Sequence, residues 1–102
     1  MLTEESQPGR GFLSDLCRQW EAEALKAELL GMRVVCLRTG MVLSRDGGTL
    51  ERILPMFRFG LGGTLGSGTQ YWSWITLEDM VRVMGFALQN DRITGPINIV
   101  SP

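Results

Sequence analysis

Residues 33–38, with the sequence RVVCLR, constrain the fold more than any other part of this chain. Four consecutive apolar residues, two of them β-branched valines, stand between two arginines. An uninterrupted apolar run is typical of a strand that is buried on both faces, as in parallel sheets covered by helices on each side. We therefore expect this strand to lie inside an α/β sheet.

A long helix is predicted before this strand, over residues 12–30. Apolar residues recur there at spacings of three and four, which places them on one stripe of a helix, and charged residues occupy the other face. The stripe consists of Leu13, Leu16, Cys17, Trp20, Ala24 and Ala27. Gly31 provides a natural stop, because glycine adopts the left-handed conformation without steric cost.

The second half of the chain alternates in the same way. A short helix is expected after the strand, capped by Thr49, and Pro55 should kink or end it. A glycine-dense loop over residues 60–68 leads into an extended aromatic stretch over 70–75. A second long helix is expected after Thr76, because Thr76 and Asp79 have the spacing of a capping box. A short strand over residues 97–100 follows.

This alternation predicts an α/β architecture, but two or three strands make a poor sheet. Burying an apolar side chain is worth roughly 1.5–3 kcal/mol only if partner elements cover it. Residues 1–102 are therefore expected to be one partial domain of a larger sheet. We divide it into a helix and central strand (12–44), an insertion with the glycine-rich loop (45–75), and a helix with a returning strand (76–102).

Composition argues against several classes of function. Ten basic and eleven acidic residues give a net charge of −1, which favours neither nucleic acid nor anionic lipid as a partner. No apolar run reaches the roughly 18–20 residues that cross a bilayer. Histidine, the commonest metal ligand, is absent, so no metal site is expected. Cys17 and Cys36 are interpreted as buried thiols of a reducing compartment, either the cytoplasm or an organelle stroma or matrix.

Four motifs occur in order along the chain: FLxxLCxxWE at 12–21, LRxGxVL at 37–43, LGGxLGSGxQ at 61–70 and SWIxxxD at 73–79. Together they resemble the sugar-nucleotide epimerase-like branch of the extended, atypical short-chain dehydrogenase/reductases, and in particular its "epimerase family" proteins. The resemblance runs from about Thr3 to Pro102 and covers the central to C-terminal part of such proteins. It implies an incomplete Rossmann-like doubly wound parallel sheet, which is the C-terminal half of the NAD(P)-binding fold with part of the substrate lobe.

The resemblance also implies NAD or NADP as cofactor, but the glycine turn that holds the cofactor phosphates would lie upstream of Met1. The glycines at 60, 63 and 66 have a similar spacing. They follow a kinked apolar segment and precede an extended one, whereas the phosphate turn joins a strand to a helix. We interpret them as a bending or closely packed loop, and a ligand-facing role stays open.

Catalysis in typical relatives uses a tyrosine and, four residues later on the same helix face, a lysine. The resemblance places Cys17 and Glu21 at these positions, and they are the catalytic candidates. A glutamate raises the pKa of a neighbouring acid, where a lysine lowers it. A core thiol and a solvated helix face are the alternative interpretations of the two residues. The single tyrosine of the sequence, Tyr71, has no lysine four residues later.

Thr39, Gly40 and Met41 are the cofactor-binding candidates. They follow the strand at the position where related folds bring backbone close to the nicotinamide, outside the carboxyl ends of parallel strands. The alternative is that Gly40 simply makes the turn.

Arg58, Gly63 and Trp72 are the substrate-binding candidates. The arginine suits a phosphate, the glycine belongs to the substrate-side loop of the family, and the tryptophan suits stacking on a sugar or base. Packing into a core or interface is the alternative for the tryptophan. Ser44 and Thr76 depart from the typical relatives, which have glycine and histidine there.

Two functions follow from the resemblance. In one, the chain is part of an NAD(P)-dependent epimerase/dehydratase-like oxidoreductase that acts on a nucleotide-sugar or a similar small molecule, and is inactive alone. In the other, it is a non-catalytic nucleotide-binding or partner-binding module that has lost the tyrosine and lysine. An open sheet edge makes a homodimer, or aggregation of the isolated chain, a further expectation.

Overall fold

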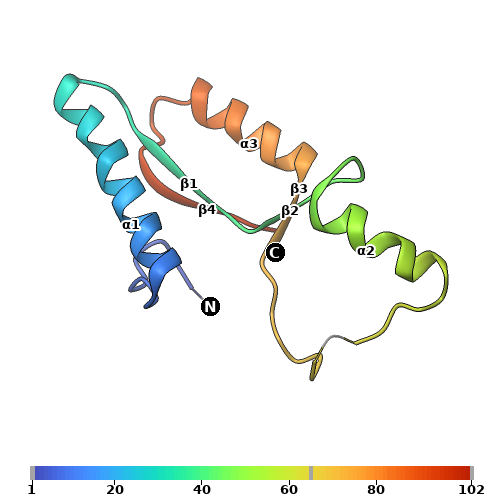
Figure 1. The fold of residues 1–102 in the computed structure, drawn as a ribbon. Coiled ribbons are helices and arrows are strands. Elements are labelled where there is room, and N and C mark those ends of the chain that lie inside the picture. The colour runs from blue at the N-terminus through green and yellow to red at the C-terminus, as the bar shows by residue number, and fades with distance from the viewer. Residues whose placement is uncertain (1, 65, 102) are drawn as a thin grey trace. The chain divides into compact units, whose positions relative to one another are not determined.

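The computed structural model describes residues 2–64 and 66–101, in which helices and strands alternate (Figure 1). Met1, Pro102 and Leu65 of the glycine-rich loop lie outside the described residues. The elements are α1 (Phe12–Leu25), the 3₁₀ helix η1 (Lys26–Leu30), β1 (Val35–Thr39), β2 (Met41–Leu43), α2 (Gly48–Arg58), β3 (Trp74–Thr76), α3 (Leu77–Gln89) and β4 (Gly95–Ile99). The chain divides into two compact units, residues 1–38 with 85–98 and residues 39–84 with 99–102.

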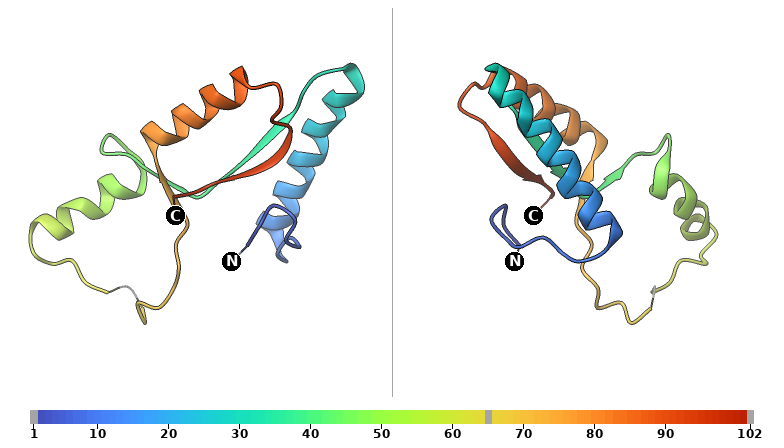
Figure 2. Two further views of the ribbon diagram at one scale, coloured as in Figure 1. Left: turned by 180° about the vertical axis from the view of Figure 1, so that it is seen from behind. Right: turned by 60° about the vertical axis from the view of Figure 1, so that its left-hand side comes forward.

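β1 and β4 form a two-stranded sheet and lie side by side in Figure 1 and in the left view of Figure 2. The Gly95 N–H donates to the Val34 carbonyl at 2.9 Å, and the Gly40 N–H donates to the Ile99 carbonyl at 3.2 Å. Residue numbers rise together along both strands, so the pair is parallel. The predicted strand over 33–38 is therefore confirmed as a parallel strand, although it begins at Val35.

The helix predicted over residues 12–30 is α-helical to Leu25 and continues as the 3₁₀ turn η1. Gly31 ends it with a φ of 78°, as the sequence predicts. The apolar stripe does not meet a core, because no residue of α1 is buried. Leu13 and Trp20 are 72% and 68% exposed. The stripe thus lacks a covering partner among the described residues.

β2 and β3 form the parallel sheet of the second unit, with Met41 opposite Trp74 and Leu43 opposite Thr76. The Ser101 N–H donates to the Trp74 carbonyl at 2.7 Å and extends the hydrogen bonding of β3. β2 was not expected from the sequence, since three residues are too few to show a strand periodicity.

The expectation that Thr49 caps α2 is wrong, and α2 does not end at Pro55. The helix begins at Gly48, so Thr49 lies in its first turn, and its N-terminus has no side-chain cap. It also continues past Pro55 to Arg58, and the Phe59 N–H donates to the Pro55 carbonyl at 3.0 Å. Proline removes its own N–H and crowds the carbonyl four residues before it, but the N–H groups that follow it can still bond to carbonyls behind them.

α3 begins as predicted, with Thr76 as the capping residue. The Asp79 N–H donates to the Thr76 hydroxyl oxygen at 3.1 Å, which satisfies one of the unpaired donors of the first turn. The Thr76 hydroxyl in turn donates to the Asp79 carboxylate at 2.8 Å. The carboxylate therefore binds the capping side chain itself and not the capping backbone.

The described residues bury very little apolar surface. Three hydrophobic residues are buried, namely Ile75, Ala87 and Ile99. Residues 35–38 of β1 are only half-buried. β4 is the only described strand beside β1, so the further elements that such a strand needs are not among the described residues. The core that such a sequence requires is incomplete.

Gly40 is required by a close backbone approach. A β-carbon at this position would lie 2.6 Å from the carbonyl carbon and oxygen of Ser73 and 2.9 Å from the Trp74 nitrogen. Backbone atoms at such distances cannot move aside cheaply. Gly40 therefore allows β2 to lie against the segment that enters β3, and it does more than make a turn.

Replacing Gly40 with alanine should destabilise the protein by about 1–3 kcal/mol, because the added methyl overpacks a site lined by backbone. Urea unfolding of G40A measures this loss. Gly85→Ala is the matched control, since Gly85 lies inside α3 and a β-carbon there meets nothing within 4 Å. That control should be stabilised by about 0.5–1 kcal/mol. Equal stability of G40A and the parent chain would show that Ser73 yields freely.

Candidate functional site

A hollow of about 330 Å³ lies in the first unit, and we call it the α1 hollow. Four of its lining residues come from one face of α1, at spacings of three, four and seven: Ser14, Cys17, Arg18 and Glu21. Arg38 of β1, Asn98 of β4 and parts of the lead-in segment 2–9 complete the lining. The two catalytic candidates thus face the same hollow.

Arg38 joins three segments around the α1 hollow by hydrogen bonds: its own strand β1, helix α1 and the lead-in segment. Its Nε donates to Glu21 Oε1 at 2.7 Å and its Nη2 donates to Glu21 Oε2 at 2.8 Å. Its Nη1 donates to the Glu4 carbonyl at 2.9 Å. Such a two-bond fork between a guanidinium and a carboxylate is stronger and more directional than a single hydrogen bond.

This fork fixes the charge of Glu21. The hydrogen bond from Arg38 lowers the pKa of Glu21, and the same bond raises the pKa of Arg38. Glu21 is therefore an anion at neutral pH and is poorly suited to donate a proton or to supply the positive charge of a lysine. Its side chain is 27% exposed and bound at both oxygens, so the alternative of a freely solvated helix face is also wrong.

The two cysteines are free thiols in different surroundings. Cys17 is exposed and lines the α1 hollow, so the interpretation as a core thiol is wrong for this residue. Cys36 is partly buried on β1. Burial, and then the negative charge of Glu21, raise the pKa of Cys36, which keeps this thiol protonated at neutral pH. Cys17 is thus the more accessible thiol.

The three cofactor-binding candidates lie where β1 passes into β2. Their backbone is largely engaged in the protein: the Gly40 N–H donates to the Ile99 carbonyl, and the Met41 N–H donates to the Ser73 carbonyl at 2.8 Å. Neither N–H is available to a ligand. Thr39 is exposed at the end of β1 and offers its side chain.

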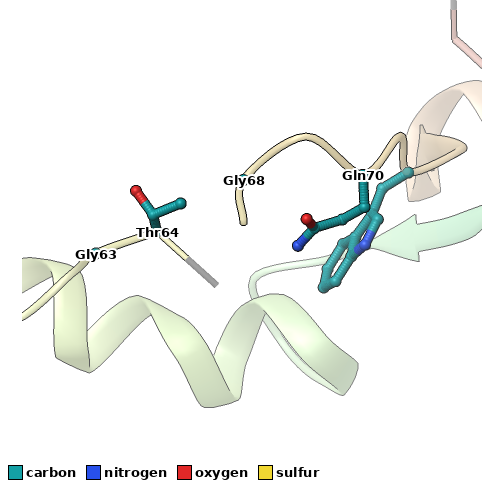
Figure 3. A pocket seen from close by; sticks show the side chains of 5 residues that line it. Gly63, Thr64, Gly68 and Gln70 are labelled. Atoms are coloured by element: carbon teal, nitrogen blue, oxygen red, sulfur yellow. The ribbon is translucent and has the colours of Figure 1, made fainter. Parts of the chain in front are cut away.

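A second hollow, of about 250 Å³, lies in the glycine-rich region of the second unit, and we call it the loop hollow (Figure 3). It is lined by Gly63, Thr64, Gly68, Gln70 and Trp72. The carboxamide of Gln70 is directed into the space beside Gly68 and Thr64 (Figure 3). The indole of Trp72 is 51% exposed, so an aromatic face borders this polar rim.

The structure therefore brings together two of the three substrate-binding candidates. Gly63 and Trp72 line the loop hollow, whereas Arg58 does not and is exposed in the last turn of α2. The glycines at 60, 63 and 66 follow α2 and lead into irregular chain, so they do not form the strand–turn–helix of a phosphate site. The sequence interpretation of these glycines as a loop is confirmed.

A third hollow, of about 500 Å³, lies at the carboxyl ends of β2 and β3. It is lined by Ser44 and Thr76, the two positions at which the sequence departs from the pattern it resembles, together with Leu43, Leu77 and Val81. Because Leu43 pairs with Thr76, these distant positions become neighbours. Both positions stand out in the sequence as departures, and this is the signal that could have marked the site, but the sequence alone does not bring them together.

Within residues 2–64 and 66–101, no three metal-ligating side chains gather into a group. No helix of this described part has the length and apolar character that crossing a bilayer requires.

Parallel strands joined through helices define a mixed α/β protein of Rossmann-like type, and comparisons with known proteins specify the relatives. No protein-family model matches the chain. Over all 102 residues it is 45% identical to the epimerase family protein ML0860 of Mycobacterium leprae, of which it covers 33%. It is 43% identical over the same length to the chloroplastic epimerase family protein SDR39U1 homolog of Arabidopsis thaliana, of which it covers 29%.

Two crystal structures agree with this. The nucleoside-diphosphate sugar epimerase of Corynebacterium glutamicum matches 99% of this chain with a TM-score of 0.90 and 42% identity, over 22% of its own length. Human epimerase family protein SDR39U1 (isoform 2), crystallised with NADPH, matches 95% with a TM-score of 0.81 and 36% identity, over 37% of its length. The chain is a homologue of the epimerase family proteins, and it spans about a third of the length of the curated relatives it matches.

The residues of this chain do not by themselves fit a dinucleotide. The glycine-rich loop lacks the helix N-terminus that receives a pyrophosphate. The N–H groups of Gly40 and Met41 are used within the protein. Glu21, at the position of the usual lysine, presents a negative charge already paired with Arg38. A cofactor would need further residues to hold it.

Replacing Glu21 with glutamine should cost about 1 kcal/mol of stability at pH 7, because it breaks a charge-assisted fork that is only partly exposed. The folded pKa of Glu21 lies below its ordinary value of 4.5, so the stabilisation is present above that value and is lost as pH falls through the folded pKa. The difference between E21Q and the parent chain in urea unfolding should therefore shrink as the pH falls below 4.5 and through the folded pKa.

Glu23→Gln is the matched control for this experiment. Glu23 pairs with Lys26 on the exposed side of the same helix, with side chains 71% and 64% exposed. Its loss should change stability by less than about 0.5 kcal/mol. If E21Q and E23Q behave alike, Arg38 does not hold α1 against β1.

Proposed function

We propose that residues 1–102 form the central to C-terminal part of an NAD(P)-dependent epimerase/dehydratase-like oxidoreductase. The observation that carries this proposal is similarity along almost the whole chain to a human protein crystallised with NADPH. The incomplete core supports it, because only three hydrophobic residues of the described part are buried and β1 has a strand on one side only. The cofactor phosphates then bind to residues outside this sequence.

The loop hollow is the proposed site for the substrate, a nucleotide-sugar or a similar small molecule. An exposed indole beside hydroxyl, carboxamide and glycine backbone groups suits a sugar ring, which has one apolar face and a rim of hydroxyls. The similarity to a nucleoside-diphosphate sugar epimerase supports the same class of substrate.

A non-catalytic module is the second candidate, and the Arg38–Glu21 fork favours it. The position of the catalytic lysine carries an anion, and that anion is occupied by a structural ion pair. Cys17, at the tyrosine position, is an exposed free thiol. In this version the longer protein binds the nucleotide, or a partner, without transferring hydride.

The proposed location is a reducing compartment, the cytoplasm or an organelle stroma. Both cysteines are free thiols, and one relative is chloroplastic. Disulfides form and persist in oxidising compartments, so two unpaired thiols agree with this proposal.

The cofactor proposal predicts that a longer protein, read from the DNA upstream of residue 1, contains a strand, a glycine turn and a helix and binds NADPH. Cofactor at 100 times its Kd should stabilise that protein by about 2.7 kcal/mol and raise its melting temperature. The 102-residue chain should show no shift under the same conditions. NADH and NADPH are compared in parallel, and no shift of the longer protein at millimolar cofactor refutes nucleotide binding.

The substrate proposal predicts that Trp72→Ala weakens binding of a nucleoside-diphosphate sugar to the longer protein by about 5–150-fold, since a stacked ring contributes about 1–3 kcal/mol. Isothermal titration calorimetry measures the change. Tyr71→Ala is the control, because Tyr71 is adjacent and fully exposed but does not line the hollow. Equal affinities of W72A and the parent protein place the substrate elsewhere.

A further inference from the structure

The loop hollow has no charged group among its described lining residues. Two glycines and three neutral side chains form this lining: Gly63, Thr64, Gly68, Gln70 and Trp72. Arg58, the candidate that suits a phosphate, is not part of it. A charged group that enters such a hollow loses water without gaining an ion partner, which is unfavourable. The hollow therefore favours the uncharged part of a ligand.

The size of the loop hollow limits how much of a ligand it can hold. Its volume of about 250 Å³ is below the roughly 300–1,000 Å³ of pockets that enclose a whole drug-sized ligand. A nucleoside diphosphate joined to a sugar contains a base, a ribose, the phosphates and the sugar ring. A hollow of this size thus receives one ring of such a molecule.

Two lining residues contact each other across the loop, and their contact sets the width of the hollow. A β-carbon at Gly68 would overlap the methyl group of Thr64. Figure 3 shows this methyl directed toward Gly68. Gly68 also has a φ of 70°, a conformation that favours glycine. The Thr64 methyl therefore fills the space that a side chain at position 68 would need.

The part of the loop that leads to Thr64 is anchored to α2. The Leu61 N–H donates to the Met56 carbonyl at 2.9 Å, the long-range bond of a Schellman motif at the end of the helix. The ring of Phe57 lies against the backbone of Gly62, where a β-carbon would overlap it. These contacts hold one wall of the hollow against the helix.

We propose that the loop hollow accepts only the uncharged sugar ring of the substrate, and that the contact between Thr64 and Gly68 determines which rings fit. This inference rests on the proposed function, because it concerns the same substrate site. A ring that carries only hydroxyls fits the neutral lining. A ring with a carboxylate brings an unpaired charge, and a ring with a bulky substituent meets the Thr64 methyl. Thr64 and Gly68 are thus specificity-determining residues.

The first test compares four probes by calorimetry on the longer protein: UDP, UDP-glucose, UDP-glucuronate and UDP-N-acetylglucosamine. UDP-glucose should bind more tightly than UDP, which lacks the ring. It should also bind at least about fivefold more tightly than UDP-glucuronate, whose carboxylate finds no partner. The acetamido group of UDP-N-acetylglucosamine should reduce affinity by about tenfold or more.

The outcomes of this comparison separate the two proposals. If no UDP-sugar binds more tightly than UDP, the proposed substrate site fails and this inference fails with it. If UDP-glucose gains affinity from its ring and loses it in Trp72→Ala, the site stands. Equal binding of the three sugars in that case overturns this inference alone.

A glycine pair tests the contact at position 68. Gly68→Ala places a methyl where that of Thr64 lies, so affinity for UDP-glucose should fall by about tenfold or more. Gly66→Ala is the matched control, because Gly66 has a φ of 63° and a β-carbon there meets nothing within 4 Å. It introduces similar backbone strain without the overlap. Equal losses in the two variants overturn the role of the contact.

Removing the Thr64 methyl completes the series. Adding Thr64→Ala to Gly68→Ala should restore the affinity for UDP-glucose to that of Gly66→Ala, because the overlapping group is gone. Thr64→Ala alone should raise the affinity for UDP-N-acetylglucosamine relative to UDP-glucose by about tenfold. An unchanged ratio in Thr64→Ala overturns the proposal, even if Gly68→Ala does not fold. Urea unfolding establishes which variants are folded.

Discussion

The first unit depends on one guanidinium. Arg38 extends from β1 to the carboxylate of Glu21 on α1 and to the backbone of Glu4 in the lead-in segment. Glu4 then reaches Asn98 of β4. The planar fork of an arginine fits a carboxylate in one orientation and stays charged at any physiological pH. Helix, strand and lead-in are thereby fixed around the α1 hollow, and the contact with Arg38 keeps Glu21 an anion at neutral pH.

These polar contacts matter because apolar burial is incomplete. Removing apolar surface from water contributes about 25 cal/mol per Å², the dominant favourable part of folding. Here the stripe of α1 and the faces of β1 keep much of that surface exposed. A chain with so little apolar burial gains a larger share of its order from hydrogen bonds and ion pairs than a domain with a large buried core does. The exposed stripe remains a large apolar surface that a covering element can bury.

The sequence predicted those features whose signals are local. The parallel strand at 35–39, the stop at Gly31 and the cap at Thr76 each follow from a few adjacent residues. β2 escaped prediction because its partner β3 lies about thirty residues away and its own three residues carry no period. The contact of Arg38 with Glu21 also joins distant segments, so no local pattern reveals it.

At the candidate site, too, the sequence predicted local features and missed those that depend on distant segments. The resemblance named Cys17 and Glu21, four residues apart on one helix, and named Gly63 and Trp72 separately, and each pair lines one hollow of the structure. Whether a backbone N–H is free to bind a ligand depends on which segment lies opposite it. The N–H groups of Gly40 and Met41 bond to carbonyls of distant segments, so neither is free for a cofactor, and the sequence alone does not reveal this.

The contact between Gly40 and Ser73 has an evolutionary consequence. Any side chain at position 40 would displace the backbone at 73 and 74, and the indole at 72 sits one residue before it. Relatives that replace this glycine must therefore also reshape the segment leading into β3, together with the rim of the loop hollow. Positions 40 and 73 lie more than thirty residues apart in the sequence, and they must change together in evolution or both stay unchanged.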